Sequence, residues 1–439
     1  MNVLRIYRTV RARVLVPVTI LFIMLANTSH AQNIEHALRL DDYGLTLPLA
    51  PSPRAAGRAG AFVASVNDVS ALAINPAGLG RVRRLDATLA MHFDDPGTRS
   101  SLGGIGTLHT QGDAGLGALA ISIPLRVYRG AFSVAAGVFR AYESSTRIQY
   151  TSFNAIDDMD EQYLLQQRGS VLAYYVGIGG EIASRLTAGV SAFALDGTIS
   201  PLTQYTRLPR TTAGASQIFL TDDASLDVDG VGGRVGVQFE IVRGLRVGVV
   251  VASPIYVHTG GDALVEVVTI AAGGIGSISQ STEKRSVDYL LPPRVDGGLA
   301  VTMGPLTVEM NAGFTDWSRT IVQRHRPVDR FLQPEFHNTV DVRTGAVWSL
   351  RRWPVRVSTG FAIVPYPLRM LPFDRIGNNI VPATITRQRH MWAIGAGALL
   401  SSSISVDVAW QKASGRRNTG GYIQADHNRR VTCSASWRF

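Results

Sequence analysis

The stretch SISVDVAWQK, Ser403–Lys412, places an apolar residue at every second position. One face carries Ile404, Val406, Val408 and Trp410, and the other carries Ser405, Asp407, Ala409 and Gln411. A period of two predicts a β-strand with two chemically different faces. The same alternation recurs in GRVGVQFEI (233–241), LTVEMNAGF (306–314) and VRVSTGFAI (355–363). Strands of this kind are therefore expected along much of the chain.

Two folds accept such strands: a soluble sandwich turns the apolar face to its core, and a membrane barrel turns it to lipid. The barrel is favoured because the chain is 46% hydrophobic yet has almost no helix-period segment. The strands also form close hairpins, with turns at Ala183-Ser184, Arg243-Gly244 and Ser401-Ser402 that suit the periplasmic side. Longer polar segments are expected to be loops on the other side, at 143–169, 197–232, 257–293, 316–338, 365–388 and 413–428. We predict an all-β, transmembrane antiparallel β-barrel of about 14 strands.

The first 31 residues have the order of a secretory signal peptide. Arg5, Arg8, Arg11 and Arg13 precede the apolar run VLVPVTILFIMLA, and Ser29-His30-Ala31 follows it. Cleavage after Ala31 would remove four arginines and lower the formal net charge from +10 to about +6. The remaining basic residues are scattered, which excludes a nucleic-acid-binding stripe. Cys433 is the only cysteine, so no intrachain disulfide is possible.

The chain ends in RRVTCSASWRF, a further alternating stretch with Trp437 and Phe439 on one face. A terminal aromatic residue on such a strand resembles the signal that the barrel assembly machinery reads in bacterial outer-membrane proteins. With the signal peptide, this predicts export to the outer membrane of a Gram-negative bacterium. Expected surroundings are outer-membrane lipid and lipopolysaccharide.

A barrel of this size has a lumen too wide for its own side chains to fill, since roughly eight strands already suffice for a packed interior. We therefore divide the chain into a signal peptide (1–31), a lumen-filling N-terminal plug (32–84) and the barrel (85–439). Asn75-Pro76 cannot lie in a central strand, and the glycines at 57, 60, 78 and 80 permit tight turns. A short helix is expected near VNDVSALA (66–73), capped by Asn67 or Asp68 and stopped by Pro76. A plain periplasmic extension is the alternative.

The stretch GRAGAFVASVNDVSALAINPAGL (57–79) resembles the N-terminal plug motif of the FadL-type outer-membrane transporters of long-chain fatty acids and other hydrophobic compounds. Seven residues carry the match: Gly57, Gly60, Asp68, Asn75, Pro76, Ala77 and Gly78. Further similarity lies in LPPRVDGGLAV (291–301), DWS (316–318) and WPVRVSTGFAIVPYP (353–367). The resemblance implies a monomeric 14-stranded barrel whose plug gates passive uptake of a hydrophobic ligand, with lateral release through a kink in the wall. It also implies that the plug is held by modest contacts and can rearrange.

A fatty-acid ligand would need a cation for its carboxylate. Arg234, Arg343 and Arg356 fall on polar strand faces and are the ligand-binding candidates, although lumen arginines can instead pair with acids such as Glu240 or Glu309. An outer-loop helix around Tyr163, Leu164 and Leu165 could add apolar lining. We predict no catalytic residue, cofactor or metal site, because no nucleophile or metal motif is present. The second hypothesis is a PorV-like shuttle of type IX secretion, a branch of the same superfamily that acts on proteins.

Overall fold

The computed structural model describes residues 50–439 except 103–104, 111, 129, 155–158, 210–216, 271–275, 320, 325–334, 351, 366–367, 377–378, 386–387 and 420–421. The predicted signal peptide and residues 32–49 lie outside the described residues. Three short helices come first: α3 (Pro53–Ala56), α4 (Ala71–Ile74) and the 3-10 helix η1 (Pro76–Arg81). Among the described residues, no helix is long and apolar enough to cross a membrane.

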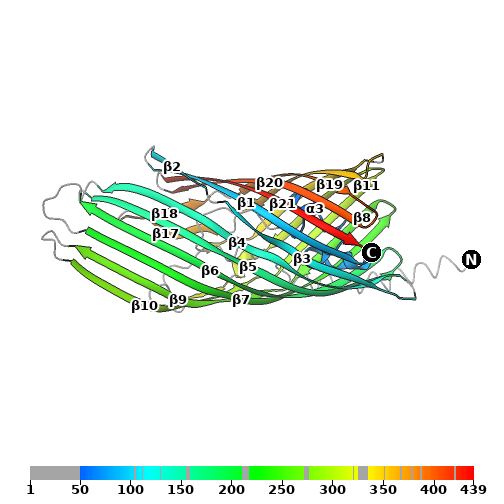
Figure 1. The fold of residues 1–439 in the computed structure, drawn as a ribbon, viewed down its shortest axis with the longest axis horizontal. Coiled ribbons are helices and arrows are strands. Elements are labelled where there is room, and N and C mark those ends of the chain that lie inside the picture. The colour runs from blue at the N-terminus through cyan, green and yellow to red at the C-terminus, as the bar shows by residue number, and fades with distance from the viewer. Residues whose placement is uncertain are drawn as a thin grey trace, which may run out of the picture.

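Antiparallel strands make up the rest of the described chain (Figure 1). They are β1 (Asp86–Leu102), β2 (Ile105–Thr110), β3 (Asp113–Leu125), β4 (Phe132–Asn154), β5 (Met159–Ala183), β6 (Leu186–Pro209), β7 (Gln217–Val242), β8 (Leu245–Ala252), β9 (Ile255–Ile270), β10 (Gly276–Leu291), β11 (Arg294–Met303), β12 (Leu306–Thr315), β13 (Ile321–Arg324), β14 (Glu335–Phe336), β15 (Thr339–Ser349), β16 (Val355–Pro365), β17 (Leu368–Ile376), β18 (Asn379–Ile385), β19 (Gln388–Leu399), β20 (Ile404–Thr419) and β21 (Tyr422–Arg438). The 3-10 turn η2 (Trp317–Arg319) lies between β12 and β13.

The strands close into one barrel, because β1 pairs with β21 from Asp86↔Arg438 to Leu102↔Tyr422. Several consecutive pieces continue one another along the wall; Ser253-Pro254, for example, separates β8 from β9, and Pro292-Pro293 separates β10 from β11. With such pieces joined, the barrel has 14 strands, as predicted. Proline interrupts the ladder at these two breaks because it lacks an N–H donor.

The two faces of the strands decide between the two folds considered above. In β20 the polar side chains are buried, with Ser405 2% and Asp407 3% exposed, whereas Val406 is 38% and Val408 44% exposed. Polar side chains therefore face the lumen and apolar ones face outward, the reverse of a soluble sandwich. A closed barrel with an apolar outer surface is a structure for the outer membrane of a Gram-negative bacterium.

The predicted short turns are confirmed, since β5 ends at Ala183, β7 at Val242 and β19 at Leu399, each followed closely by the next strand. The predicted long loops are wrong for most of 143–169, 197–232, 257–293, 365–388 and 413–428, which are strand. Most of the sixth, 316–338, lies outside strands or outside the described residues. β5 has 25 residues and β7 has 26, so strands run through 159–183 and 217–242. Hydrophobic alternation fades there because a wall that continues beyond the membrane meets water on both faces. The expected helix at Tyr163, Leu164 and Leu165 is wrong for the same reason, since these residues belong to β5.

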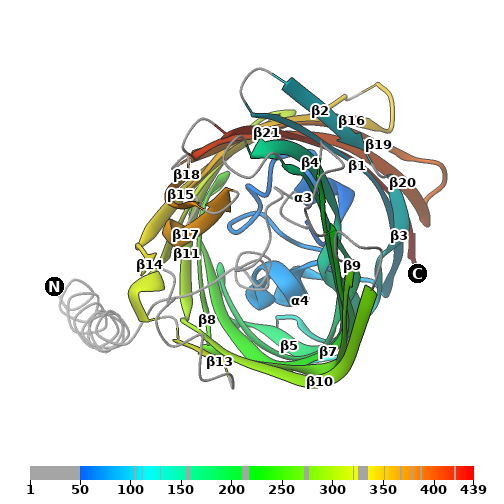
Figure 2. The ribbon, with the colours of Figure 1, turned by 90° about the vertical axis from the view of Figure 1, so that its left-hand side faces the viewer.

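Residues 50–84, here called the luminal segment, lie inside the barrel (Figure 2). The segment comes so close to the wall that a Cβ would overlap or crowd it at several wall glycines. The neighbouring atoms include the Asn75 side chain at Gly236, and backbone atoms of the segment at Gly179, Gly189, Gly248, Gly298, Gly345, Gly360 and Gly395. These glycines come from eight different strands. Glycine is required at such positions because it alone leaves room for a second backbone.

Local sequence explains how the luminal segment begins and ends its turns. Helix α4 starts at Ala71 with Ser70 at the N-cap, so the expected caps Asn67 and Asp68 are wrong. The Asp68 carboxylate accepts a hydrogen bond from Ser70 N at 3.0 Å instead, an Asx-type turn that precedes the helix. The helix ends at Ile74, and Asn75-Pro76 then opens η1.

Candidate functional site: a pocket in the barrel lumen

Asn75 is the centre of the luminal segment and is completely buried. Its amide donates to Val63 O at 2.9 Å and to Val237 O of the wall at 3.4 Å. Its Oδ1 accepts from Ala77 N at 3.2 Å and so caps η1. A Cβ at Gly236 would overlap this oxygen. Asn75 therefore joins two turns of the luminal segment to strand β7.

Asp68 is held at the centre of a second polar contact. Arg54 Nη1 lies 3.1 Å from Asp68 and Arg54 Nε lies 3.3 Å from Asp407 of β20. Burial acts to raise the pKa of Asp68, but Arg54 and the hydroxyl of Ser70 outweigh it and hold the pKa below the usual range. The ionised carboxylate therefore stabilises the docked luminal segment.

The matched glycines are points of close approach. Gly57 lies against Ser358 and Gly395 of the wall, and Gly78 lies against Val66. Gly60 has φ +83°, which L residues rarely adopt, and a Cβ there would stand 2.9 Å from Arg343 Nη1. Pro76 and Ala77 are buried in η1. The motif residues thus lie at contacts that either hold turns of the luminal segment together, as at Gly78 and Asp68, or join the segment to the wall, as at Gly57 and Gly60.

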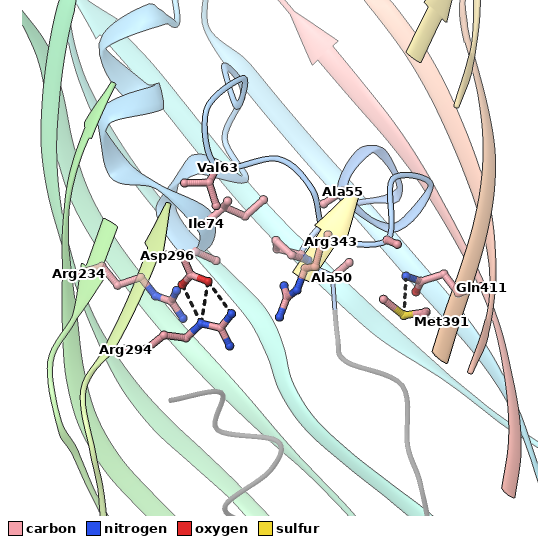
Figure 3. Close-up of a pocket in the computed structure, with 14 residues that line it drawn as sticks. Ala50, Ala55, Val63, Ile74, Arg234, Arg294, Asp296, Arg343, Met391 and Gln411 are labelled. Carbon is pink, nitrogen blue, oxygen red and sulfur yellow. Dashed lines mark hydrogen bonds and ion pairs between the residues drawn. The ribbon is translucent and has the colours of Figure 1, made fainter. Parts of the chain in front are cut away.

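A pocket opens beside this segment, with a cavity volume of about 120 Å³ (Figure 3). One side is mostly apolar and comes mainly from the luminal segment, including Ala50, Ala55, Val63 and Ile74. The other side comes from the wall: Arg234 of β7, Arg294 and Asp296 of β11, Arg343 of β15, Met391 of β19 and Gln411 of β20. The pocket is therefore amphipathic, as a site for a ligand with one polar end would be.

Two of the three arginines have carboxylate partners. Arg294 Nε lies 2.7 and 2.8 Å from the two oxygens of Asp296, and its Nη2 also contacts Asp341. Arg343 Nε lies 2.8 Å from Asp341. Three arginines thus face two carboxylates, which leaves one positive charge in excess.

Arg234 is the one of the three with no ion pair to a carboxylate among the described residues. It is half-buried, and its guanidinium lies on the same side of the pocket as Asp296 (Figure 3). Its Nε is buried without a hydrogen-bond partner among the described residues, as are Arg294 Nη2 and Arg343 Nε. A buried guanidinium nitrogen with no acceptor costs free energy. An anionic ligand group at this point would supply the missing acceptor.

The three predicted arginines separate in space. Arg234 and Arg343 line the pocket, but Arg356 does not: its Nη2 lies 2.5 Å from Asp407, beside Arg54. Of the acids expected to pair with lumen arginines, Glu240 lies 3.6 Å from Arg81 and 3.8 Å from Arg246. Glu309 accepts from Ala64 N at 2.7 Å and from the hydroxyl of Ser65.

Sequence reasoning missed Arg294, Asp296, Met391 and Gln411 as pocket residues. Arg294 and Asp296 lie in LPPRVDGGLAV, whose resemblance to the family was noted without assigning them a role. Two charged residues that are two positions apart on a predicted strand lie on the same face. That spacing was a signal from which an ion pair between Arg294 and Asp296 could have been predicted. Met391 and Gln411 carry no such signal.

The wall is interrupted on the other side of the lumen, between β3 and β4. Their pairing runs from Leu125↔Phe132 to Ala118↔Phe139. Above this point, the described residues show no further pairing of β4 with β3 or β2. Both strands are irregular there, because register shifts occur between Ala90 and Met91 in the β1–β3 ladder and between Arg140 and Tyr142 in the β4–β5 ladder. Bulges of this kind bend a strand and end its pairing.

A buried polar cluster lies beside the interruption. His92, Asp94 and Glu143 each offer a ligand atom within 4.8 Å of the others, so a metal ion could reach all three. However, Arg140 Nη1 lies 3.0 Å from Glu143 and Arg430 Nη2 lies 2.7 Å from Asp94. Both carboxylates already have a cationic partner, so a divalent ion would add uncompensated charge, and the residues fit an ion-pair network better than a metal centre.

The predicted assembly signal lies where the barrel closes. Phe439 N donates to Leu85 O and Leu85 N donates to Phe439 O, both at 3.1 Å. Trp437 pairs with Ala87 of β1 and Ile404 of β20. The Phe439 side chain is 73% exposed. The last residues are therefore the edge that must meet β1 before the barrel is complete.

No family model matches the chain, and no curated protein matches it. Solved structures do match. The toluene transporter TodX of Pseudomonas putida has a TM-score of 0.63 at 13% identity, over 88% of this chain and 97% of TodX. A FadL homologue of Pseudomonas aeruginosa has a TM-score of 0.60 at 13% identity, over 90% of this chain and 100% of the homologue.

The chain has the fold of the FadL-type transporters. The toluene transporter TbuX of Ralstonia pickettii is similar too, with a TM-score of 0.58 at 16% identity over 90% of this chain and 100% of TbuX. The FadL-type fold expected from the sequence is thus confirmed over nearly the whole length of these proteins. Identities this low establish the fold, and the ligand has to be argued from the pocket.

Proposed function

We propose that this protein is an outer-membrane channel for the passive uptake of hydrophobic small molecules. The observation that carries the proposal is the amphipathic pocket between the luminal segment and the wall. A hydrophobic molecule cannot cross the polar outer leaflet unaided, and a lumen with an apolar surface at its centre offers it a path. The FadL-type fold supports this reading, since similar structures include toluene transporters.

The ligand of this proposal carries a carboxylate, and long-chain fatty acids are the first candidates. Arg234 supplies a cation whose buried Nε has no acceptor among the described residues, while Ala55, Val63 and Ile74 supply apolar contact. At about 120 Å³ the cavity is smaller than the ~150 Å³ that holds benzene in an engineered protein core. It therefore receives the head of the ligand, and the chain of the ligand extends into the lumen.

The luminal segment is the proposed gate, and the interruption between β3 and β4 is the proposed exit. The segment blocks the direct route to the periplasm, and its first described residues, Ala50 and Pro51, line the pocket. Unpaired wall above Ala118 and Phe139 supports lateral release into the membrane. In this proposal the protein acts as a monomer, is inserted by the barrel assembly machinery, and has lipopolysaccharide around its outer half.

The test begins with the mature protein purified in mild detergent. Native mass spectrometry identifies any hydrophobic molecule retained by the barrel, and displacement with fatty acids and matched neutral hydrocarbons ranks the two classes. Arg234→Gln is expected to weaken fatty-acid binding about 10- to 100-fold, because it removes a charge-assisted hydrogen bond. Hydrocarbon binding should be unchanged.

The matched control is Arg126→Gln, since Arg126 is an exposed arginine in the β3–β4 turn and should leave both affinities unchanged. Equal loss for acids and hydrocarbons in Arg234→Gln would contradict a head-group role. An empty barrel that co-purifies with a secreted protein would instead support the PorV-like shuttle.

A further inference from the structure

One side chain forms a hydrogen bond across the interruption between β3 and β4. Arg140 follows Phe139, the last residue of β4 paired with β3, and its Nε donates to Leu116 O of β3 at 2.8 Å. Leu116 O lies beyond the last β3–β4 pair, so the guanidinium takes the place of a strand N–H. The side chain of Arg140 is only 12% exposed, so it lies within the wall.

Gly115 makes room for this guanidinium. A Cβ at Gly115 would overlap Arg140 Nη2 and stand 2.8 Å from Cζ. At Gly117, two residues along the same strand, the nearest atom to an added Cβ is 3.4 Å away, an ordinary contact. The two glycines on one strand therefore differ in one respect that matters here: only Gly115 accommodates Arg140.

A chain of hydrogen bonds and ion pairs holds Arg140 from the lumen side. Arg140 Nη1 lies 3.0 Å from Glu143, Glu143 contacts His92 Nε2, and His92 lies 3.8 Å from Asp94. Asp94 is bound in turn by Arg430 of β21. The chain runs from β4 past β3 to β1 and β21, so it ties together strands on both sides of the interruption.

The depth of Arg140 matches the membrane. It lies about eight residues above Phe132, where β4 begins. At ~3.3 Å per residue and a tilt of ~40°, this is roughly 20 Å above the periplasmic end, within an apolar band of ~25 Å. A charged side chain at this depth is costly unless it is bonded, and the bonds to Leu116 O and Glu143 meet that requirement.

We infer that Arg140 is a movable stopper in the wall, held closed by Glu143 and His92, and that ligand leaves the lumen sideways when this side chain withdraws. The inference rests on the proposed function, and it adds which residues close the exit. Backbone pairing would close the wall permanently, whereas a flexible side chain closes it reversibly. Withdrawal breaks the two hydrogen bonds of Arg140 and leaves the barrel ladder intact.

The experiment compares Gly115→Ala with Gly117→Ala in lipid nanodiscs. The barrel is loaded with a fluorescent long-chain fatty acid, and the lipid carries an energy-transfer acceptor that reports arrival of the probe. Gly115→Ala pushes the flexible end of Arg140 out of the interruption, so release should be about tenfold faster or more. Gly117→Ala should release at the wild-type rate. Arg140→Ala, which removes the stopper, should match Gly115→Ala.

Binding of the probe distinguishes failure of the stopper from failure of the proposed function. Normal loading with equal release from Gly115→Ala and wild type would overturn the stopper and leave the proposed function standing. A wild-type barrel that takes up no probe would overturn the proposed function and the stopper with it. If Arg140→Ala does not assemble, Gly115→Ala still decides, because it keeps every ion-pairing side chain.

Discussion

Replacing Asn75 by alanine should loosen the luminal segment without disturbing the barrel. The change removes the acceptor of Ala77 N and the donor to Val63 O. Val63 O keeps a second donor, because Gln238 Nε2 lies 3.1 Å from it, but Ala77 N is left buried without an acceptor. One buried unsatisfied N–H costs about 1–3 kcal/mol. A loss of about 2 kcal/mol raises the open population of the segment roughly 30-fold.

Hydrogen exchange read by mass spectrometry measures that opening directly. Amides of the luminal segment should exchange roughly 30-fold faster in Asn75→Ala, while amides of β20 and β21 keep their wild-type rates. Uptake of ligand should fall, because the proposed gate no longer holds one conformation. Wild-type uptake by a correctly inserted variant would count against a gating role for Asn75.

Gly236→Ala tests the same contact by changing the wall residue that faces Asn75. Its Cβ would overlap Asn75 Oδ1, so Asn75 must leave its place and the segment should loosen as in Asn75→Ala. The double variant Asn75→Ala/Gly236→Ala should be no looser than either single variant, since the overlapping oxygen is gone. Additive effects in the double variant would refute the reasoning, because they would mean that the two residues act through different contacts.

Three further outcomes follow from the same structure. Asp68 has a lowered pKa, so its stabilising ionised form is present above the ordinary carboxyl range and lost below it. The protection factors of luminal-segment amides, taken relative to the intrinsic exchange rate at each pH, should therefore fall as pH falls below about 4, and this fall should be absent in Asp68→Asn. Deletion of Phe439 removes both backbone hydrogen bonds to Leu85 and should slow insertion, as followed by the heat-modifiable gel shift of the folded barrel; unchanged surface levels would make the terminal residue incidental. Gly60→Ala should destabilise docking by about 1 kcal/mol or more, since φ is +83°, and a Gly60→Asn variant, which tolerates that region better, should recover part of the loss.

Strand patterning predicted the barrel well because it depends only on neighbours in the chain. Val406 and Val408 alternate with Ser405 and Asp407 whatever the rest of the protein does, and the lipid-facing side follows from that alternation. The strand extensions were missed because a wall exposed to water on both faces imposes no alternation. β5, for example, runs through MDEQYLLQQ from Met159 onward.

Sequence reasoning could not predict the His92–Glu143 contact or the set of arginines in the pocket, because both depend on the register of the strands. His92 and Glu143 are 51 residues apart, and they meet across β3 next to the register shift between Arg140 and Tyr142 in the β4–β5 ladder. Arg234 and Arg343 were predicted from their strand faces, but the separation of Arg356 from them depends on height in the barrel. A strand pattern gives the face of a residue and leaves its height open.

The contacts of the luminal segment limit how the proposed gate can work. Sequence reasoning expected modest contacts, but wall side chains bind the segment's backbone at several points: Ser191 to Leu72 O, Gln238 to Val63 O and Val66 O, Gln411 to Ala56 O, and Glu309 to Ala64 N. Each of these hydrogen bonds contributes about 1 kcal/mol net. Burial of Phe62, Leu72 and Leu79 adds about 2 kcal/mol for each side chain. Removal of the whole segment would therefore cost more free energy than the ~8 kcal/mol that binding of a micromolar ligand supplies. A ligand can shift an equilibrium between two conformations by no more than the difference in its binding free energy for them. Gating is therefore expected to move a local part of the segment, beginning at Ala50 and Pro51 where the pocket lies, while Asn75 and its glycine contacts stay in place.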